Sequence, residues 1–332
     1  MKTIAIINQK GGCGKTTTAI SLAGFFAAAN WRTLLVDMDP QGHCAAGLSI
    51  PEQRLDLTVA DAMLASDQPE GVDTTRLLWR ASRNLDLIPS TMHLAALEAA
   101  RGGLAEKPEP EKALRRALHR MKPKYDVCLI DCSPSIGLLA YNALAAADMV
   151  LIPVETGFFS LQGASKQVST IRALGRRLGT EPEQWVLPTM HDPASMLAQD
   201  LLAELIRRFE SRVIPHAIRY DRSLREAASF GQPVGEYAPE SSGAEDYRRV
   251  AAWALGELVK LSAPAARPAD PLSDPHSAGR FAGELLVTPS DAESLVGTTP
   301  CTVGATGSIG AVEADCDSML DSLTHHGPGE VG

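Results

Sequence analysis

The sequence predicts an α/β fold, with a doubly wound and mostly parallel sheet flanked by helices, over residues 1–261. Short apolar runs rich in branched side chains alternate along the chain with longer stretches of helical periodicity. The first apolar run leads directly into a glycine-rich loop, and carboxylates follow two of the later runs. Because neighbouring parallel strands must be joined by a crossover, this alternation indicates a parallel sheet with helices on its faces.

The first three predicted elements are a strand, a loop and a helix. Residues 3–7 are apolar or β-branched throughout, which is typical of a buried parallel strand. Residues 8–17 contain three glycines, and residues 18–29 show a helical pattern. This order predicts a phosphate-binding loop, because glycines let backbone N–H groups approach phosphate oxygens and the helix N-terminus adds partial positive charge.

The loop reads Asn-Gln-Lys-Gly-Gly-Cys-Gly-Lys-Thr-Thr from position 8. Lys15 is expected to reach the β and γ phosphates of a nucleotide, and the Thr16 hydroxyl to ligate Mg²⁺. The usual pattern requires glycine where this chain has Gln9, and a second lysine, Lys10, opens the glycine-rich part. Since Lys10 cannot easily serve its own phosphates as Lys15 does, we expect it to act toward a second subunit. The nucleotide-contacting residues predicted from the loop are Lys10, Gly11, Gly12, Cys13, Gly14, Lys15, Thr16 and Thr17.

The remaining elements continue the alternation. Further strands are predicted at residues 33–37, 85–88, 125–131, 149–153 and 185–188. Helices are predicted at residues 57–64, 111–121, 137–147, 161–178, 198–209 and 244–261, with short extended pieces near 213–218. The strands are short apolar runs, and the helices space their apolar side chains three and four residues apart. Thr58 is a candidate N-cap at the start of its helix.

Three aspartates follow predicted strands. Asp37 and Asp39 come where the strand at 33–37 ends, and Asp131 ends the strand at 125–131. Ligands of open parallel sheets bind at the carboxyl ends of the strands, so these carboxylates are expected to meet near the loop. They could there position Mg²⁺, its water and an attacking water.

These motifs together resemble those of the ParA/MinD ATPases, and most closely the ParA/Soj-type partitioning ATPases. Lys-Gly-Gly-x-Gly-Lys-Thr-Thr is similar to their deviant Walker A motif, and Asp-Met-Asp-Pro-Gln-Gly from Asp37 is similar to their switch I. Asp-Cys-Ser-Pro-Ser from Asp131 resembles switch II, with Ser133 where proline is commoner. Segments at 151–156, 188–192 and 224–233 extend the resemblance over residues 1–261.

The resemblance implies an ATPase of the P-loop class that uses ATP and Mg²⁺ and hydrolyses slowly until a partner completes its switches. Lys10 would cross a face-to-face homodimer to contact the partner's nucleotide. Asp39 would be needed for hydrolysis, so Lys10, Lys15 and Asp39 are the predicted catalytic residues. Thr16, Asp37 and Asp131 are the predicted magnesium ligands, with Asp131 acting through water.

The resemblance also implies partners. An ATP-bound dimer would bind DNA without sequence preference and would move or space a cargo, which could be a chromosome, a plasmid or a protein compartment. A ParB-like activator or cargo adaptor would stimulate hydrolysis. DNA contacts are predicted at Arg219, Arg222 and Arg225, although these arginines are offset from the family's pattern and Ala194 replaces an arginine that several relatives use. A second basic candidate runs from 112 to 124, and either run could instead be a solvated helix face.

Charge is distributed unevenly along the chain. The net charge is −9, but residues 263–332 hold two basic and ten acidic residues, leaving 29 basic and 30 acidic in the rest. The acidic total therefore does not argue against nucleic-acid binding by the folded part. Residues 262–332 are rich in Pro, Gly, Ser and acid, which predicts a disordered tail. The tail could be an inert solubilising segment or could carry a motif that docks a partner.

The sequence favours a cytoplasmic, nucleoid-associated protein. No apolar run is long enough to span a membrane, the N-terminus enters a strand without room for a signal peptide, and anionic lipid would repel the acidic tail. Cys13, inside the loop, suits a reducing compartment. Cys128 and Cys132 are expected to be buried thiols rather than metal ligands, and His191 is expected on a surface loop.

Two other functions stay open at this point. One is a nucleotide-gated interaction protein that places or regulates a membrane or envelope assembly without binding DNA. The other is a metabolic P-loop enzyme, which Lys10 and the lack of an evident substrate motif disfavour.

Overall fold

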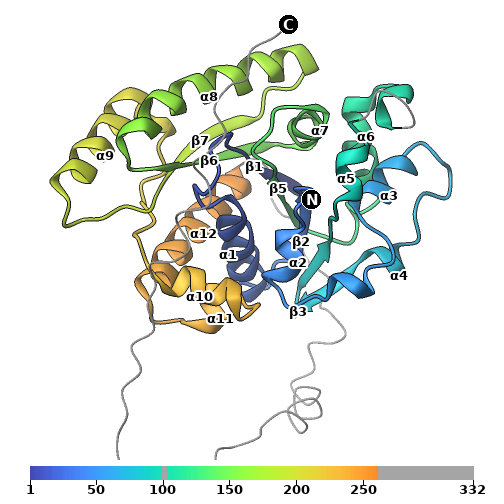
Figure 1. Ribbon diagram of the computed structural model, residues 1–332, viewed down its shortest axis with the longest axis horizontal. Coiled ribbons are helices and arrows are strands. Elements are labelled where there is room, and N and C mark those ends of the chain that lie inside the picture. The colour runs from blue at the N-terminus through green and yellow to red at the C-terminus, as the bar shows by residue number, and fades with distance from the viewer. Residues whose placement is uncertain (99–102, 261–332) are drawn as a thin grey trace, which may run out of the picture. The chain divides into compact units, whose positions relative to one another are not determined.

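A seven-stranded sheet forms the centre of the molecule (Figure 1). The computed structural model describes residues 1–98 and 103–260. The strands are β1 (Lys2–Ile6), β2 (Thr33–Met38), β3 (Trp79–Ser82), β4 (Leu85–Ile88), β5 (Val127–Cys132), β6 (Met149–Glu155) and β7 (Glu183–Thr189). Their order is β3-β4-β2-β5-β1-β6-β7, and all neighbours are parallel except β3 and β4. The predicted doubly wound, mostly parallel sheet is confirmed.

Helices cover both faces of this sheet. They are α1 (Lys15–Ala28), α2 (His43–Ala46), α3 (Val59–Leu64), α4 (Thr74–Leu77), α5 (His93–Ala96), α6 (Ala113–His119), α7 (Leu138–Ala146), α8 (Phe158–Leu178), α9 (Met196–Phe209), α10 (Ser223–Ser229), α11 (Val234–Tyr237) and α12 (Ser242–Lys260). In Figure 1, α1 and α12 lie on one side of the central strands, and α7 and α8 lie on the other.

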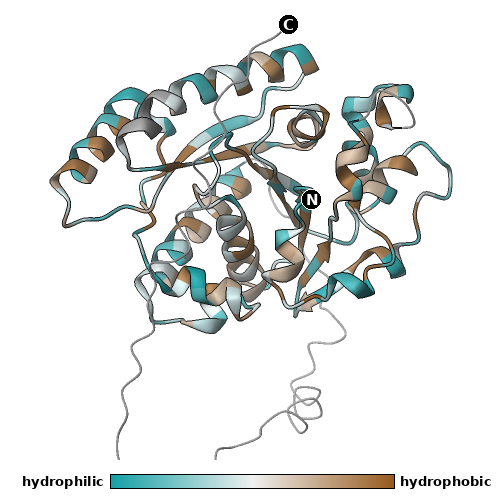
Figure 2. Ribbon diagram, viewed as in Figure 1, coloured by the Kyte–Doolittle hydropathy of each residue, from teal (hydrophilic) through white to brown (hydrophobic). Residues whose placement is uncertain are grey.

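The two faces bury separate cores because successive strand residues point to opposite sides. In β1, Ile4 and Ile6 pack in the core with α1 and α12, whereas Ala5 packs in the core with α3, α6 and α7. Figure 2 shows hydrophobic residues along the central strands and polar residues on the outer faces of the helices. The strands are apolar on both faces because helices cover both.

The strand order reverses at β1, and this positions the functional site. From β1 the chain crosses to β2 on one side, while β6 pairs with β1 on the other side. The register places Ile6 beside Asp131, and Asp37 beside Asp131, so the carboxyl ends of β1, β2 and β5 coincide. A reversal of this kind opens a crevice at the carboxyl ends of the strands.

Several local features differ from the sequence-based expectation. The antiparallel edge strand β3 and the short helices α2, α4, α5, α10 and α11 were not predicted. The extended pieces near 213–218 make only isolated bridges, in which Val186 pairs with Val213 and His191 with Arg219. The expected helix at 111–121 is shorter, because a 3₁₀ turn at Pro110–Lys112 precedes α6. Thr58 is confirmed as the N-cap of α3, where its N–H donates to Asp61 at 2.8 Å.

None of the helices in the described ranges is both long enough and apolar enough to cross a membrane. The predicted tail at 262–332 lies outside the described residues, so the division of the chain at 261 stays a prediction.

Candidate functional site

The glycine-rich loop between β1 and α1 leads directly into the N-terminus of α1. Gly12 and Gly14 have φ of 72° and 90°, a left-handed conformation that favours glycine. A Cβ on Gly11, Gly12 or Gly14 would meet no atom within 4 Å, so the loop borders open space. No side chain caps α1, whose N-cap is Gly14. The first N–H groups of α1 are therefore available to an anion.

Lys15 and Thr16 begin α1 and face the ends of the strands. Lys15 is only 8% exposed, and its Nζ donates to the backbone oxygen of Lys10 at 3.2 Å. The Thr16 hydroxyl donates to Oδ2 of Asp131 at 2.6 Å. The helix thus places an ammonium and a hydroxyl beside the carboxylate of Asp131, near the end of β5.

The expected aspartates meet at this point. The oxygens of Asp37 accept the N–H of Asp39 at 3.0 Å and of Cys44 at 2.9 Å. Asp39 lines the cavity described below, and its Oδ1 accepts the N–H of Gln41 at 3.0 Å. Oδ1 of Asp131 is buried and has no hydrogen-bond partner among the described residues.

The electrostatics of this cluster favour a cation. Burial raises the pKa of Asp37, and the neighbouring charge of Asp131 raises it further. Burial likewise raises the pKa of Asp131. Ligand atoms of Asp37, Cys44 and Asp131 lie within 4.8 Å of one another. The buried, unpartnered oxygen and the close carboxylates fit a divalent cation, since a cation would relieve the repulsion between them.

Lys10 lies outside this cluster. Its Nζ forms an ion pair with Glu155 at the end of β6, and the two side chains are 45% and 35% exposed. Its backbone N–H donates to Asn8 Oδ1 at 2.9 Å, and the Asn8 amide donates to the Pro153 oxygen at 2.5 Å. The base of the loop is therefore fixed to β6, while the lysine side chain stays near the surface.

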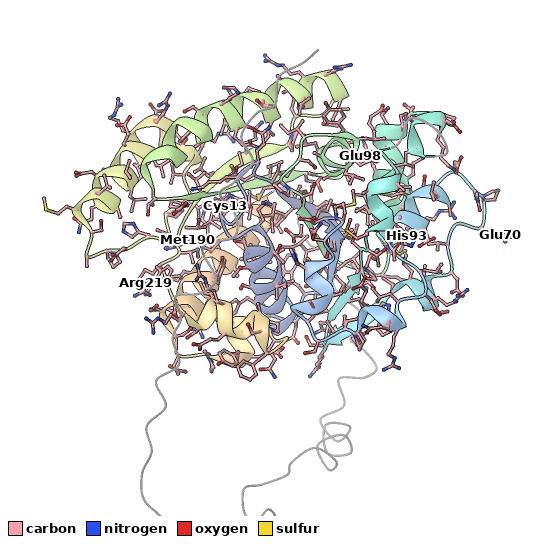
Figure 3. The ribbon with its side chains drawn as sticks, in the orientation of Figure 1. Cys13, Glu70, His93, Glu98, Met190 and Arg219 are labelled. Carbon is pink, nitrogen blue, oxygen red and sulfur yellow. The ribbon has the colours of Figure 1, made fainter. Side chains whose placement is uncertain are left out.

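A cavity of about 660 Å³ opens beside the loop. One wall consists of loop glycines with Lys15, Thr16 and Thr17, and another of Asp39 with residues 133–135. The third wall comes from late in the chain, with Met190, Ile218 and Tyr220 as its apolar part. Figure 3 shows Met190 and Arg219 near one another on one side of Cys13. The cavity is large enough for a nucleotide, with polar groups at one end and apolar groups at the other.

Cys13 does not line the cavity. Its side chain is fully buried, and burial raises the pKa of its thiol. The Cys13 backbone oxygen accepts the hydroxyl of Thr189 at 3.0 Å, which ties the loop to the end of β7. Cys128 and Cys132 are buried free thiols, as expected.

The three arginines predicted to contact DNA have different surroundings. Arg219 donates to both oxygens of Asp246 at 2.8 Å and to Glu245 at 3.0 Å. The Arg225 guanidinium lies 5.7 Å from the centre of the Tyr220 ring, and Arg222 is exposed. Of the three arginines, only Arg222 has neither an acidic partner nor an aromatic ring against it among the described residues.

The surroundings of His191 differ from what the sequence predicted. The sequence predicted a surface loop histidine, but the side chain is only 8% exposed. Its N–H donates to the Ile218 oxygen at 2.9 Å, and its own oxygen accepts the N–H of Tyr220 at 3.0 Å. This pairing of segments distant in sequence buries the ring.

Sequence reasoning missed other residues of the site. Glu155 holds Lys10, Cys44 Sγ lies 3.5 Å from Asp131, and the buried Tyr247 hydroxyl lies 2.9 Å from that of Thr18. Glu155 could have been found, because it ends an apolar run expected at the same sheet edge. Tyr247 gave no such signal, since it belongs to an ordinary amphipathic helix pattern.

The fold and the loop geometry define a P-loop nucleotide-binding protein. A family described as "AAA domain" matches residues 1–182. The sporulation initiation inhibitor protein Soj of Bacillus subtilis (strain 168) is 39% identical over 247 residues, covering 74% of this chain and 95% of Soj. The chromosome partitioning protein ParA of Myxococcus xanthus (strain DK1622) is 40% identical over 265 residues, covering 79% of this chain and 89% of that protein. The chain belongs to the Soj/ParA family of partitioning ATPases, and the resemblance inferred from its motifs is confirmed.

A solved structure shares the fold. Cobyrinic acid a,c-diamide synthase from Mycobacterium smegmatis, with bound ADP and magnesium, has a TM-score of 0.67 and 28% identity. The match covers 81% of this chain and all of the synthase. This synthase is less similar in sequence than the two partitioning proteins are.

Proposed function

We propose that this protein is a Mg²⁺-dependent ATPase that positions a cargo by cycling between an ATP-bound dimer on DNA and a released form. One observation carries the proposal. Lys15, Thr16 and Asp39 line a single cavity with Asp131 behind it, whereas Lys10 is outside that cavity at the surface. A lysine placed there can reach a second subunit more readily than it can reach its own nucleotide.

Different residues around the cavity would have different roles in the reaction. The loop N–H groups and Lys15 would hold the β and γ phosphates, and Thr16, Asp37 and Asp131 would hold Mg²⁺. Bound Mg²⁺ supplies positive charge that offsets the charge developing on the phosphate oxygens. Asp39 would orient the attacking water, since its carboxylate borders the cavity. Phosphoryl transfer depends mainly on such positioning and charge stabilisation, so a partner that completes the switches could control the rate.

DNA and a second protein are the partners that we propose for this ATPase. Two similar proteins, from Myxococcus xanthus and Thermus thermophilus, are named for chromosome partitioning, which supports DNA and a ParB-like activator as partners and a location at the nucleoid. The near balance of charge outside the tail permits such binding. Arg222 and Arg225 are the better DNA candidates, because Arg219 is committed to Asp246. The cargo could be a chromosome, a plasmid or a protein compartment.

The test is binding of random-sequence duplex DNA with ATP, with ADP and without nucleotide, at two salt concentrations. We expect binding with ATP only, weakened by salt because phosphate contacts release counterions. Arg222→Ala should weaken this binding, whereas Arg83→Ala, an equal charge change in the turn between β3 and β4, should not. If protein that binds ATP fails to bind DNA at low salt, the nucleotide-gated interaction protein becomes the better description.

A further inference from the structure

A second cavity, of about 390 Å³, lies at the far end of β7 from the nucleotide site. The C-terminal halves of α8 and α9 form two of its sides, and the first residues of β7 form another. It shares no lining residue with the cavity beside the loop. Figure 1 shows α8 and α9 side by side over this edge of the sheet.

Four arginines line this cavity as two pairs. Arg172 and Arg176 are four residues apart on α8, so they occupy the same helix face. Arg208 is the second-to-last residue of α9, and Arg212 follows it by four residues in the next turn. Like charges four residues apart on one helix repel each other, so the pair on α8 is unfavourable without an anion. Arg208 and Arg212 lie on either side of the break between α9 and the 3₁₀ turn at Glu210–Arg212, and both line the cavity.

None of these four guanidinium groups has a hydrogen bond or an ion pair with any residue the structure describes. Arg212 lies over the Trp185 ring, 5.7 Å from its centre. Glu204, one turn before Arg208, bonds to Arg207 at 2.6 Å and acts on Arg208 only through its charge. Arginines elsewhere do find partners, as Arg219 does with Asp246 and Arg32 with Asp126.

The cavity retains excess positive charge. Glu181 and Glu183 also line it, and Glu183 accepts the indole N–H of Trp185 at 3.4 Å. Two carboxylates offset half of the four guanidinium charges. An anionic ligand of at least two charges would balance the remainder.

The arrangement favours phosphate over other anions. Guanidinium groups form paired hydrogen bonds to phosphate oxygens, and two pairs on separate elements can each hold one phosphate. Val168, Val186 and Phe209 also line the cavity and add apolar surface to it. A concave pocket of this volume suits a small molecule better than a long backbone.

We propose that this cavity binds a small molecule carrying two phosphate groups, one held by Arg172 and Arg176 and the other by Arg208 and Arg212. The site is separate from the nucleotide site, so its occupation does not depend on the proposed function. Its position against β7, whose far end carries Thr189 and Met190 of the nucleotide cavity, connects the two sites through one strand.

The test uses calorimetric titration of the full chain with its nucleotide site saturated by ADP and Mg²⁺. The probes are fructose 1,6-bisphosphate and adenosine 3′,5′-bisphosphate, with fructose 6-phosphate as the single-phosphate control. We expect one bisphosphate to bind with a stoichiometry of one, at least tenfold more tightly than the monophosphate. Absence of binding by both bisphosphates would overturn the proposal.

Matched variants locate the binding. Arg176→Gln with Arg208→Gln removes one arginine from each pair, and Arg177→Gln with Arg207→Gln removes their neighbours, which do not line the cavity. The first double variant should bind the probe at least tenfold more weakly, and the second should bind as the parent does. Equal losses in both would mean that only overall charge matters, against the proposal. If the first variant loses DNA binding but keeps probe binding, the cavity belongs to a DNA surface and the proposal fails.

Discussion

Lys10, in the glycine-rich loop, and Lys15, at the start of α1, are five residues apart and have different surroundings. Lys15 is almost fully buried at the start of α1 and lines the nucleotide cavity. Lys10 is half exposed and pairs with Glu155 at the end of another strand. Replacing one lysine should therefore have a different effect from replacing the other.

Lys15→Ala should weaken ATP binding by roughly 10- to 100-fold. Hydrogen bonds from a charged donor contribute about 1.5–3 kcal/mol, and about 1.4 kcal/mol corresponds to a tenfold change. Direct titration with ATP and Mg²⁺ measures this change, with thermal melting as the check that the variant is folded. An unchanged ATP affinity would contradict the assignment of the loop.

Asp39→Ala should separate binding from hydrolysis. The Asp39 carboxylate borders the cavity and, among the described residues, accepts only a local bond from the Gln41 N–H, so its loss should leave the phosphate loop intact. We expect ATP affinity within a few-fold of the parent and hydrolysis reduced about 100-fold or more, the usual range for loss of a group that assists proton transfer. Phosphate release assays measure the rate. Parental turnover in the variant would remove Asp39 from the reaction.

At the scale of elements, α12 connects the nucleotide cavity to the core. Tyr247 is fully buried and bonds to Thr18 on α1, while Asp246 holds Arg219. Asp221 anchors the start of the helix, where its Oδ2 accepts the Ser242 hydroxyl and the Gly243 N–H, both at 2.7 Å. The helix thereby fixes the segment from 219 to 221 against the cavity.

Asp221→Ala should lower the free energy of unfolding by about 1 kcal/mol at neutral pH, as loss of a helix cap does. Burial favours a raised pKa for Asp221, but the hydrogen bonds from Ser242, Gly243 and Ser223 outweigh it and lower the pKa. A lowered folded-state pKa gives stabilisation that is fully present above the unfolded value of about 3.9 and is lost as the pH falls through the folded value.

Denaturant unfolding of parent and Asp221→Ala from pH 7 down to acid checks this linkage. The difference between the two proteins should be constant above about pH 5 and should shrink at lower pH. Asp221→Asn, which keeps the shape but not the charge, should fall between them. A difference that grows on acidification would contradict the assigned role.

The sequence predicted those elements whose signals are local. The strands of β1, β2 and β5 are continuous apolar runs, and the carboxylates at their ends follow directly from the sequence. β3 escaped prediction because Trp79–Ser82 is a short edge strand with half-exposed and exposed residues, and its order depends on antiparallel pairing with β4. The burial of His191 and the bond between Lys10 and Glu155 also escaped, since each joins segments brought together only by the folded sheet.

At the scale of the whole molecule, the strand reversal at β1 determines where a second subunit can act. The loop and the carboxyl ends of β2 and β5 converge on one edge, and Lys10 lies near the surface beside β6. A partner facing this edge could receive the lysine across the interface. The same geometry requires Lys10 to leave Glu155 before it can cross.

Separating Lys10 from Glu155 costs little free energy. This determines the direction and size of the effect that two substitutions should have on dimerisation. Exposed ion pairs contribute about 0.2–1 kcal/mol each, and a symmetric dimer must break two of them, so Glu155→Gln should strengthen ATP-dependent dimerisation by no more than roughly 30-fold. Lys10→Ala should instead weaken it strongly, because the cross-subunit contact to phosphate is lost. Lys166→Ala, an equal charge change at an exposed position of α8, should leave it unchanged.

Sedimentation velocity with a non-hydrolysable ATP analogue measures the monomer–dimer equilibrium of the four proteins. Dimerisation of Lys10→Ala as tight as that of the parent would show that the lysine does not cross the interface. A large loss in Glu155→Gln would show that the pair is part of the active arrangement rather than a restraint on it. Lys10→Ala is expected to weaken dimerisation, and Glu155→Gln is expected to strengthen it, although the two residues are in direct contact. These opposite effects would show that Lys10 acts across the dimer rather than through its pair with Glu155 within one subunit.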